Sequence, residues 1–231
     1  MPITFAGNPV PSDLDTRYIS RLSDEVWIAD DFNFGTTAGW DFGSSGTGAS
    51  NTLGITPSND HPGIRVLVAG QGAGWSRIRV RGNSFVSCVN QRFELISIMR
   101  LDTTANTWAL WGGNTSILEH GGFPMLRYSS AVGANWQVSG GNASVFVDTG
   151  VAATTNWIFC RMWRYATSGN INWEIRNSRT GTVLGTGTVT DGLISVIQDY
   201  GFVVKVPDGV AAANPGMTVD YVSARVWDIV R

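Results

Sequence analysis

Polar and apolar residues alternate with a period of two along several segments of this chain. In residues 77–81, Ile78 and Val80 fall on one side of an extended backbone, and Arg77, Arg79 and Arg81 fall on the other. Successive side chains of a β-strand point to opposite faces of a sheet. The alternation therefore predicts a strand here, with the three arginines on one face.

Two further segments show the same alternation. Residues 91–101, QRFELISIMRL, place on one face Phe93, Leu95, Met99 and Leu101, and on the other Arg92, Glu94, Ile96, Ile98 and Arg100. Residues 171–177, INWEIRN, place on one face Ile171, Trp173 and Ile175, and on the other Asn172, Glu174 and Arg176. Clusters of Gly, Asn, Ser and Thr separate such segments, as turns separate strands. We therefore predict an all-β fold, a two-sheet antiparallel jelly-roll sandwich.

The first 25 residues follow a different pattern. Pro2, Pro9 and Pro11 predict an extended segment, and Ser12 with Asp15 after it is typical of a helix start. The apolar side chains that then recur at helical spacing are Leu14, Tyr18, Ile19 and Leu22. So short a helix is marginal alone in water and needs a surface to pack on. We predict an N-terminal arm with a short helix over residues 1–25, and one jelly-roll domain over residues 26–231.

Composition excludes several classes of partner. The net charge is −2 at pH 7, whereas a nucleic-acid-binding domain is normally basic. The first residues lack the charged start and apolar run of a signal peptide. No segment approaches the ~20 apolar residues of a membrane helix. We therefore expect a soluble protein made in a cytoplasm, with neither a nucleic-acid nor a membrane partner.

The cysteines and histidines carry no recognisable catalytic pattern. Cys88 and Cys160 lie in apolar runs, so we predict two buried, free thiols without a nucleophilic role. His61 and His120 could serve as a catalytic base only beside a nucleophile, and no G-x-S-x-G motif is present. His61 stands between the turn residues "ND" and Pro62, which favours an extended backbone. We interpret "NDHPGI" as a turn that leads into a buried strand.

Several segments resemble a known family. "EVWIADDF", "WIFCRMWRYATSGNINWEIRNSRTGTVLGTGTV" and "MTVDYVSARVWDIV" resemble the first, the paired back and the closing strands of concanavalin A-like (lectin/glucanase) jelly rolls. The "HPGI" element and its Gly/Ala-rich sequel resemble a version of this domain in structural proteins of tailed bacteriophages. The resemblance covers residues 26–231 and implies either a carbohydrate-binding module, a glycosidase or a virion component.

The glutamates argue against hydrolysis. Glycoside hydrolysis needs two carboxylates about 5 to 9.5 Å apart, and glucanases that this chain resembles place them as Glu-x-Asp-x-x-Glu on one strand. The glutamates here are Glu25, Glu94, Glu119 and Glu174, and none stands in that motif. Glu94 and Glu174 share strand faces with arginines, so we predict ion pairs between strands. We expect no enzymatic activity.

The resemblance also implies sites for metal and sugar. Structural calcium in this fold can bridge the first and last strands, where Asp30, Asp31 and Asp220 are the matching carboxylates. We favour strand-end caps and ion-pair partners for these three, and predict no other cofactor. Exposed aromatic rings bind sugars in lectins, and the candidates here are Trp108, Trp111 and Trp136. A role in the core is the more frequent one for tryptophans of a sandwich.

Arginine composition favours an assembly role. Lys205 is the only lysine among 16 lysines and arginines, and arginine is enriched at protein interfaces where lysine is depleted. The candidate interface residues are Leu14, Tyr18, Ile19, Leu22, Arg77, Arg79 and Arg81. We expect the arm to serve assembly and not folding.

These observations favour a non-enzymatic virion structural protein of a tailed bacteriophage, specifically a capsid decoration (cement) protein. It would bind the major capsid protein or other virion subunits and form a homo-oligomer such as a trimer. One alternative is a carbohydrate-binding host-recognition module on a tail fibre or spike. The other is a glycosidase or lyase with an unfamiliar site.

Overall fold

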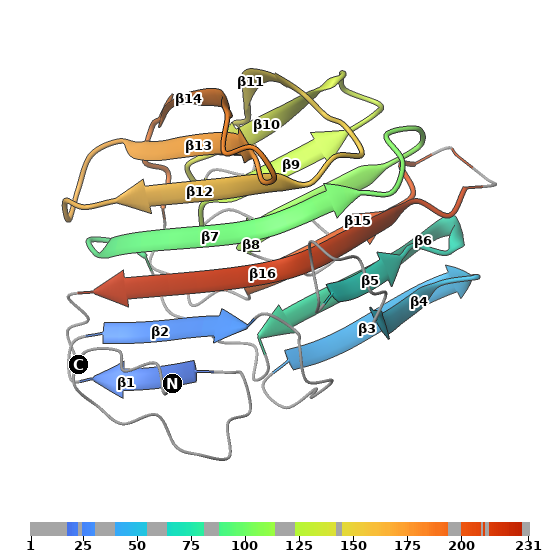
Figure 1. Ribbon diagram of the computed structural model, residues 1–231, viewed down its shortest axis with the longest axis horizontal. Helices are drawn as coiled ribbons and strands as arrows, with labels where there is room; N and C mark the ends of the chain where they lie inside the picture. The colour runs from blue at the N-terminus through green and yellow to red at the C-terminus, as the bar shows by residue number, and fades with distance from the viewer. Residues whose placement is uncertain are drawn as a thin grey trace.

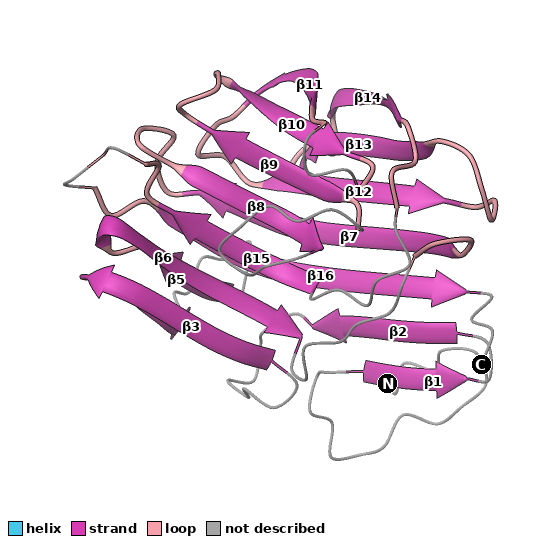
Figure 2. Ribbon diagram, turned by 180° about the vertical axis from the view of Figure 1, so that it is seen from behind, coloured by secondary structure: helices cyan, strands magenta, loops and turns pink. Residues whose placement is uncertain are grey.

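The chain folds as a sandwich of two antiparallel β-sheets (Figures 1 and 2). The computed structural model describes residues 18–22, 25–30, 40–54, 64–80, 88–113, 123–141, 145–193, 200–208, 210 and 213–227. Every regular element in these ranges is a β-strand, which confirms the predicted all-β class. No helix in this part of the chain is long and apolar enough to cross a membrane.

The larger sheet has nine described strands and faces the viewer in Figure 1. Its main path is, in spatial order, β1 (Tyr18–Leu22), β2 (Glu25–Asp30), β16 (Gly216–Trp227), β7 (Arg92–Leu101), β12 (Ile158–Arg164), β13 (Ile171–Asn177) and β14 (Val183–Val189). Off this path, β5 (Ile64–Val68) pairs with both β16 and β4 (Ser50–Gly54). The long β16 therefore has β7 on one side, and β2 followed by β5 on the other.

The smaller sheet has seven described strands and lies in front in Figure 2. Its spatial order is β11 (Val147–Ala152), β10 (Asn135–Ser139), β9 (Met125–Ser129), β8 (Trp108–Gly113), β15 (Tyr200–Lys205), β6 (Gln71–Val80) and β3 (Trp40–Thr47). The hydrogen bond from Trp111 Nε1 to Tyr200 Oη is 3.1 Å long, and Tyr200 Oη donates to the carbonyl of Ser223 in β16. This buried chain of bonds links the two sheets.

The core lies between the sheets and confirms the predicted strand faces. Ile78 and Val80 of β6 are buried, whereas Arg77 and Arg79 are half-buried on the opposite face. The inward side chains of β7 and β13 are those predicted, namely Phe93, Leu95, Met99, Leu101, Ile171, Trp173 and Ile175. Period-two alternation therefore identified both faces of these three strands correctly.

The predicted helix of the N-terminal arm is wrong over residues 18–22. These residues form β1, which pairs with β2 from Tyr18 opposite Ala29 to Leu22 opposite Glu25. A short helix has little stability of its own, and Tyr and Ile also favour strands. Pairing with β2 therefore overrides the helical spacing. Residues 1–17, including Leu14, lie outside the described ranges, and β1, which falls within the predicted arm, is part of the larger sheet.

Candidate functional site

A hollow lies on the outer face of the larger sheet, over β7, β12 and β13. These strands are neighbours, with β12 in the middle. In β12, Cys160 and Met162 point into the core. The residues between and beside them lie half-buried on the outer face, namely Phe159, Arg161 and Trp163. Strand order and alternation together gather outward side chains from three separate segments of the chain.

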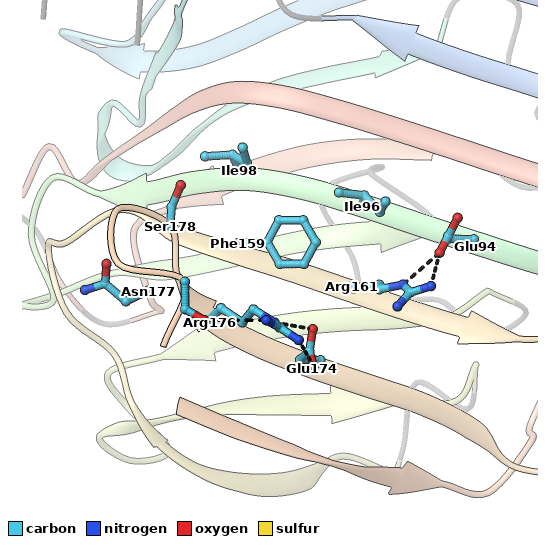
Figure 3. Close-up of a pocket in the computed structure, with 10 residues that line it drawn as sticks. Glu94, Ile96, Ile98, Phe159, Arg161, Glu174, Arg176, Asn177 and Ser178 are labelled. Atoms are coloured by element: carbon cyan, nitrogen blue, oxygen red, sulfur yellow. Dashed lines mark hydrogen bonds and ion pairs between the residues drawn. The ribbon is translucent and has the colours of Figure 1, made fainter. Parts of the chain in front are cut away.

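The floor of the hollow is apolar. Phe159 of β12 stands opposite Ile98 of β7, and Arg161 stands opposite Ile96. Figure 3 shows the Phe159 ring between these two isoleucines and the side chains of β13. The hollow has a volume of about 500 Å³, which is within the range of small-molecule sites. An aromatic ring is thus accessible at the centre of a polar rim.

The first polar group on the rim is an ion pair between β7 and β12. Arg161 donates from Nε and Nη2 to Glu94 Oε1, with the Nε bond at 2.7 Å. Tyr165 Oη also donates to Glu94 Oε1, at 3.0 Å. Side-chain exposure of 29% for Arg161 and 21% for Glu94 leaves both groups within reach of a ligand. This pair confirms the predicted ion pairing between strands for Glu94.

The second polar group lies within β13. Arg176 donates to both carboxylate oxygens of Glu174, from Nε at 2.6 Å and from Nη2 at 2.8 Å. This pairing with Arg176 holds the pKa of Glu174 below its ordinary value, against the opposing effect of burial. Glu174 pairs within its own strand, so the prediction of a partner on a neighbouring strand is wrong for this residue. Its register partner across the sheet is Arg161, whose charge acts on the same carboxylate.

A tight turn closes one end of the hollow. Asn177 Oδ1 accepts the backbone N–H groups of Arg179 and Thr180, both at 3.0 Å. Gly181 has a φ of 72°, in the left-handed region that glycine adopts without strain. Asn177, Ser178 and Gly181 line this end, so the turn supplies amide and hydroxyl groups beside the apolar floor.

Aromatic side chains continue past the other end of the hollow. Arg161 lies over the Trp163 ring, with its guanidinium carbon 4.5 Å from the ring centroid. Tyr165 is 54% exposed, and its ring meets that of Trp227 edge-on at a centroid distance of 6.2 Å. Arg225 in turn stacks over Trp227. The outer face of β12 therefore presents aromatic groups on both sides of Arg161.

The chemistry of the hollow suits binding better than acid catalysis. A general acid for glycoside hydrolysis needs a carboxyl whose pKa is raised. The pKa of Glu174 shifts in the opposite direction. Paired carboxylates and guanidiniums can nevertheless accept and donate hydrogen bonds to a polar ligand that stacks on Phe159.

The three tryptophans considered as sugar platforms are all buried, in keeping with the core role that the sequence favoured for them. Trp111 and Trp136 lie in the core between the sheets, with at most 1% of either exposed. Trp108 is on the opposite side of β8, packed with Leu110 and covered by Lys205, whose Nζ lies 4.5 Å from the ring centroid. With at most 5% of any of the three side chains exposed, their rings are not accessible to a ligand in this structure.

The predicted interface residues do not form one surface. Tyr18, Ile19 and Leu22 belong to β1 in the larger sheet, whereas Arg77 and Arg79 belong to β6 in the smaller sheet. Arg79 forms an ion pair of 2.7 Å with Asp41, and Arg77 lies over the Trp75 ring. Arg81 is outside the described residues. The arginine face predicted for β6 is thus partly occupied by contacts within the chain.

The carboxylates that the resemblance implies for calcium do not form a metal site in the described part of the chain. Asp30 ends β2 and stands opposite Val222, close to the half-buried Asp220 of β16. No group of three or more His, Cys, Asp or Glu side chains that could hold a metal occurs among the described residues. Asp31 lies outside them. The described carboxylates alone therefore do not supply the cluster that calcium binding favours.

The two cysteines match their prediction. Cys88 and Cys160 are free and buried, and burial raises the pKa of both thiols. Cys160 points into the core, whereas the outer face of its strand carries the half-buried Phe159, Arg161 and Trp163. His61 and His120 lie outside the described residues.

Sequence reasoning named Glu94 and Glu174 but missed Phe159, Arg161 and Arg176 as members of one site. The available signal was an aromatic residue on an outward position of β12, between an apolar residue of β7 (Ile98) and a charged residue of β13 (Arg176). Using that signal requires the strand order β7-β12-β13. Alternation assigns each residue to a face but does not identify its neighbours across the sheet.

Comparisons with known proteins identify the fold. No protein-family model matches the chain, and a search of curated proteins finds no match. Among solved structures, a protein of unknown function from Shewanella oneidensis MR-1 superposes with a TM-score of 0.66 at 17% identity, over 99% of both chains.

Lectin structures superpose over most of the chain as well. Lectin II from Ulex europaeus matches with a TM-score of 0.60 at 8% identity, over 88% of this chain and 99% of its own. The exoplasmic/lumenal domain of VIP36, in a form bound to Ca²⁺ and Man3GlcNAc, matches with a TM-score of 0.52 at 13% identity, over 86% of each chain. The chain therefore has a concanavalin A-like (lectin/glucanase) fold. At these identities the likeness concerns the fold alone.

Proposed function

We propose that this chain is a non-enzymatic carbohydrate-binding domain that recognises glycans in the hollow over β12. The observation that carries the proposal is the accessible Phe159 ring flanked by two carboxylate–guanidinium pairs. The VIP36 domain, which shares the fold, is bound to Man3GlcNAc in its structure. Proteins of one fold can have many functions, so the likeness to VIP36 does not by itself indicate glycan binding. The residues of the hollow do.

The hollow matches the two chemical sides of a sugar. One face of a pyranose ring carries C–H groups that stack on an aromatic side chain, and its edge carries hydroxyl groups. Phe159 with Ile96 and Ile98 provides the apolar surface. Glu94 and Arg161 provide an acceptor and a donor at the edge. Ligand sites commonly combine such an apolar lining with a few placed polar groups.

The proposal excludes hydrolysis because of how the carboxylates are paired. Both glutamates of the hollow accept hydrogen bonds from arginine side chains. An acid catalyst would have to hold a proton near neutral pH, and the pKa of Glu174 is lowered. Incubation with the bound glycan should therefore release no reducing ends, as checked by mass spectrometry of the products.

A glycan array followed by calorimetry tests the proposal. Phe159→Ala should weaken binding of the selected glycan about tenfold, since an aromatic contact contributes roughly 1 kcal/mol or more. Trp75→Ala is the matched control, because Trp75 is a half-buried aromatic residue on the outer face of the other sheet. Binding that Phe159→Ala leaves unchanged, or that Trp75→Ala removes, would place the site elsewhere and overturn the proposal.

A second candidate is the virion structural protein predicted from the sequence, and an apolar rim favours it. β11 and β14 lie side by side at one rim of the sandwich (Figures 1 and 2). Four apolar residues at this rim are 44–55% exposed, namely Val145, Val147, Val183 and Leu184. β14 carries no charged residue and ends the sheet among the described strands. Such an edge is a template for pairing with another subunit.

The second candidate includes synthesis in a host cytoplasm and incorporation into a particle as a homo-oligomer. Leu184→Lys should convert the oligomer into a monomer in size-exclusion chromatography with light scattering. Val132→Lys is the control, since Val132 is 59% exposed in a separate turn. A monomeric parent protein, together with its absence from purified phage particles by mass spectrometry, would contradict this candidate.

A further inference from the structure

We infer that the ligand is an extended, uncharged oligosaccharide that lies along β12, with a second contact at Trp163 and Tyr165. This inference rests on the proposed function and specifies its ligand. The first contact is the Phe159 ring in the hollow.

The site is longer than one sugar ring. Phe159, Arg161 and Trp163 are successive outward residues of β12, and Tyr165 follows the end of the strand. A strand rises 3.2–3.4 Å per residue, so Phe159 and Trp163 lie about 13 Å apart along β12. A ligand that touches both aromatic groups must therefore contain several linked rings.

Hydrogen-bonding groups lie between the two aromatic contacts. Glu94 Oε1 accepts from Arg161 and from Tyr165, while no described group bonds to Glu94 Oε2. Arg161 likewise donates from Nε and Nη2, which leaves Nη1 without a bond to any described group. One acceptor and one donor are thus available midway along the site, as the hydroxyl groups of a central sugar unit require.

The charges of the hollow balance. Glu94 pairs with Arg161, and Glu174 pairs with Arg176 through both carboxylate oxygens. Neither guanidinium is available as an unneutralised cation for a sulfate or a uronate. An anionic glycan would also face the two carboxylates. Charge balance therefore favours neutral sugars, whose binding changes little with salt.

The second aromatic contact is less buried than the first. Trp163 is half-buried beneath Arg161, and Tyr165 is 54% exposed beside Trp227. An edge-on arrangement of Tyr165 and Trp227 fixes the position of the Tyr165 ring. These rings can therefore contact the distal units of a chain whose first unit occupies the hollow.

Calorimetry with sugars of defined length tests the inference. The probes are cello-, malto- and manno-oligosaccharides of one to six units, with oligogalacturonides as the acidic set. We expect at least one neutral series to bind about tenfold more tightly at six units than at one, with little change between low and high salt. Trp163→Ala should remove that gain and leave the shortest ligand unaffected, whereas Phe159→Ala should weaken every length.

Control variants separate loss of contact from loss of fold. Trp163→Phe keeps an aromatic ring and should keep most of the gain in affinity with ligand length, and thermal melts check that each variant is folded.

Equal affinity at every length, or a gain in affinity that Trp163→Ala does not change, overturns the extended site but leaves glycan binding intact. Tighter, salt-sensitive binding of oligogalacturonides overturns the preference for neutral sugars. No binding of any probe overturns this inference, and the empty glycan array would then overturn the proposed function separately.

Discussion

Arg164 is a charged residue inside the core at the end of β12. It is 1% exposed and pairs with Asp191. Its Nη2 also donates to the carbonyls of Cys88 and Gln91, at 2.8 and 2.9 Å. Arg164 thus joins the 88–91 turn and the segment at residue 191 to the same strand, which explains why the alternation of β12 ends with a buried cation.

Replacing Arg164 with Met should destabilise the fold by about 3 kcal/mol, because two backbone carbonyls and Asp191 lose their partner. Arg161→Met is the control on the same strand and should cost less than about 1 kcal/mol, since the pair with Glu94 is partly exposed. Urea unfolding of both variants measures the difference. Equal losses would show that burial of Arg164 does not determine its contribution.

The thiols of Cys88 and Cys160 should react slowly in the native protein. Burial raises the pKa of each thiol, and the thiolate is the reactive form. Titration with a thiol reagent should label few groups before unfolding and both thiols afterwards, without reductant. Rapid native labelling, or no labelling after unfolding, would contradict two buried, free cysteines.

The ion pair of Glu174 should contribute to stability in a pH-dependent way. The folded-state pKa of Glu174 lies below its ordinary value of 4.5. Its contribution is therefore present above pH 4.5 and is lost as the pH falls through the lower folded-state pKa. The difference in free energy of unfolding between the parent and Glu174→Gln should be larger at pH 7 than at pH 3. If this difference in free energy grew as the pH fell, the pKa of Glu174 would be raised by folding and not lowered, contrary to the prediction.

At the scale of the element, β14 shows why glycine and threonine alternate in "GTGTV". Gly185 and Gly187 face Trp173 of β13, and a Cβ on Gly187 would lie 2.8 Å from Trp173 Cζ2. Thr186 and Thr188 point the other way and are exposed. The glycines therefore make room for the indole, and the whole segment is one strand.

Gly187→Val should destabilise the protein by about 1–3 kcal/mol, because the added side chain displaces the Trp173 ring. Thr188→Val is the matched control on the exposed face and should stay within about 0.5 kcal/mol of the parent. Thermal unfolding of both proteins checks the prediction. A neutral Gly187→Val would mean that Trp173 moves without loss of packing.

β1 changes what is expected of the N-terminal arm. An arm that served only assembly could be removed without loss of stability, but β1 is part of the larger sheet. Deleting residues 1–22 should lower Tm by roughly 5 °C relative to deleting residues 1–17, since β2 loses a paired neighbour. The two deletions differ only by β1, Tyr18–Leu22. The same Tm for both would show that β1 contributes nothing to folding.

At the scale of the whole molecule, the sequence predicted the sandwich but not the site. Period-two patterns gave the faces of β6, β7 and β13, because burial of one face forces alternation. The neighbours across the sheet follow from pairings between residues far apart in the chain, such as Ile98 with Phe159. Local pattern carries no information on such pairs. Glu94 and Glu174 were therefore recognised singly, without the ring between them.

The tryptophans failed as sugar candidates for a related reason. Trp136 stands in a polar stretch of the sequence, yet this residue belongs to β10 and points between the sheets. A polar neighbourhood in sequence does not exclude an inward position, since alternate residues of one strand face opposite sides. Conversely, Phe159 and Trp163 stand in the apolar run around Cys160, yet they are half-buried on the outer face of β12.

The apolar edge of β14 has a consequence for how strongly a glycan-coated surface could be held. The two-fold axis of an antiparallel strand pair stands perpendicular to the sheet. Two copies joined at β14 would therefore present both hollows on the same side of one continuous sheet. A shallow site gains little free energy alone, but a second site held nearby acts at a high effective concentration. Avidity of this kind can exceed the affinity of one site about 100-fold or more, so weak single contacts would suffice for firm attachment.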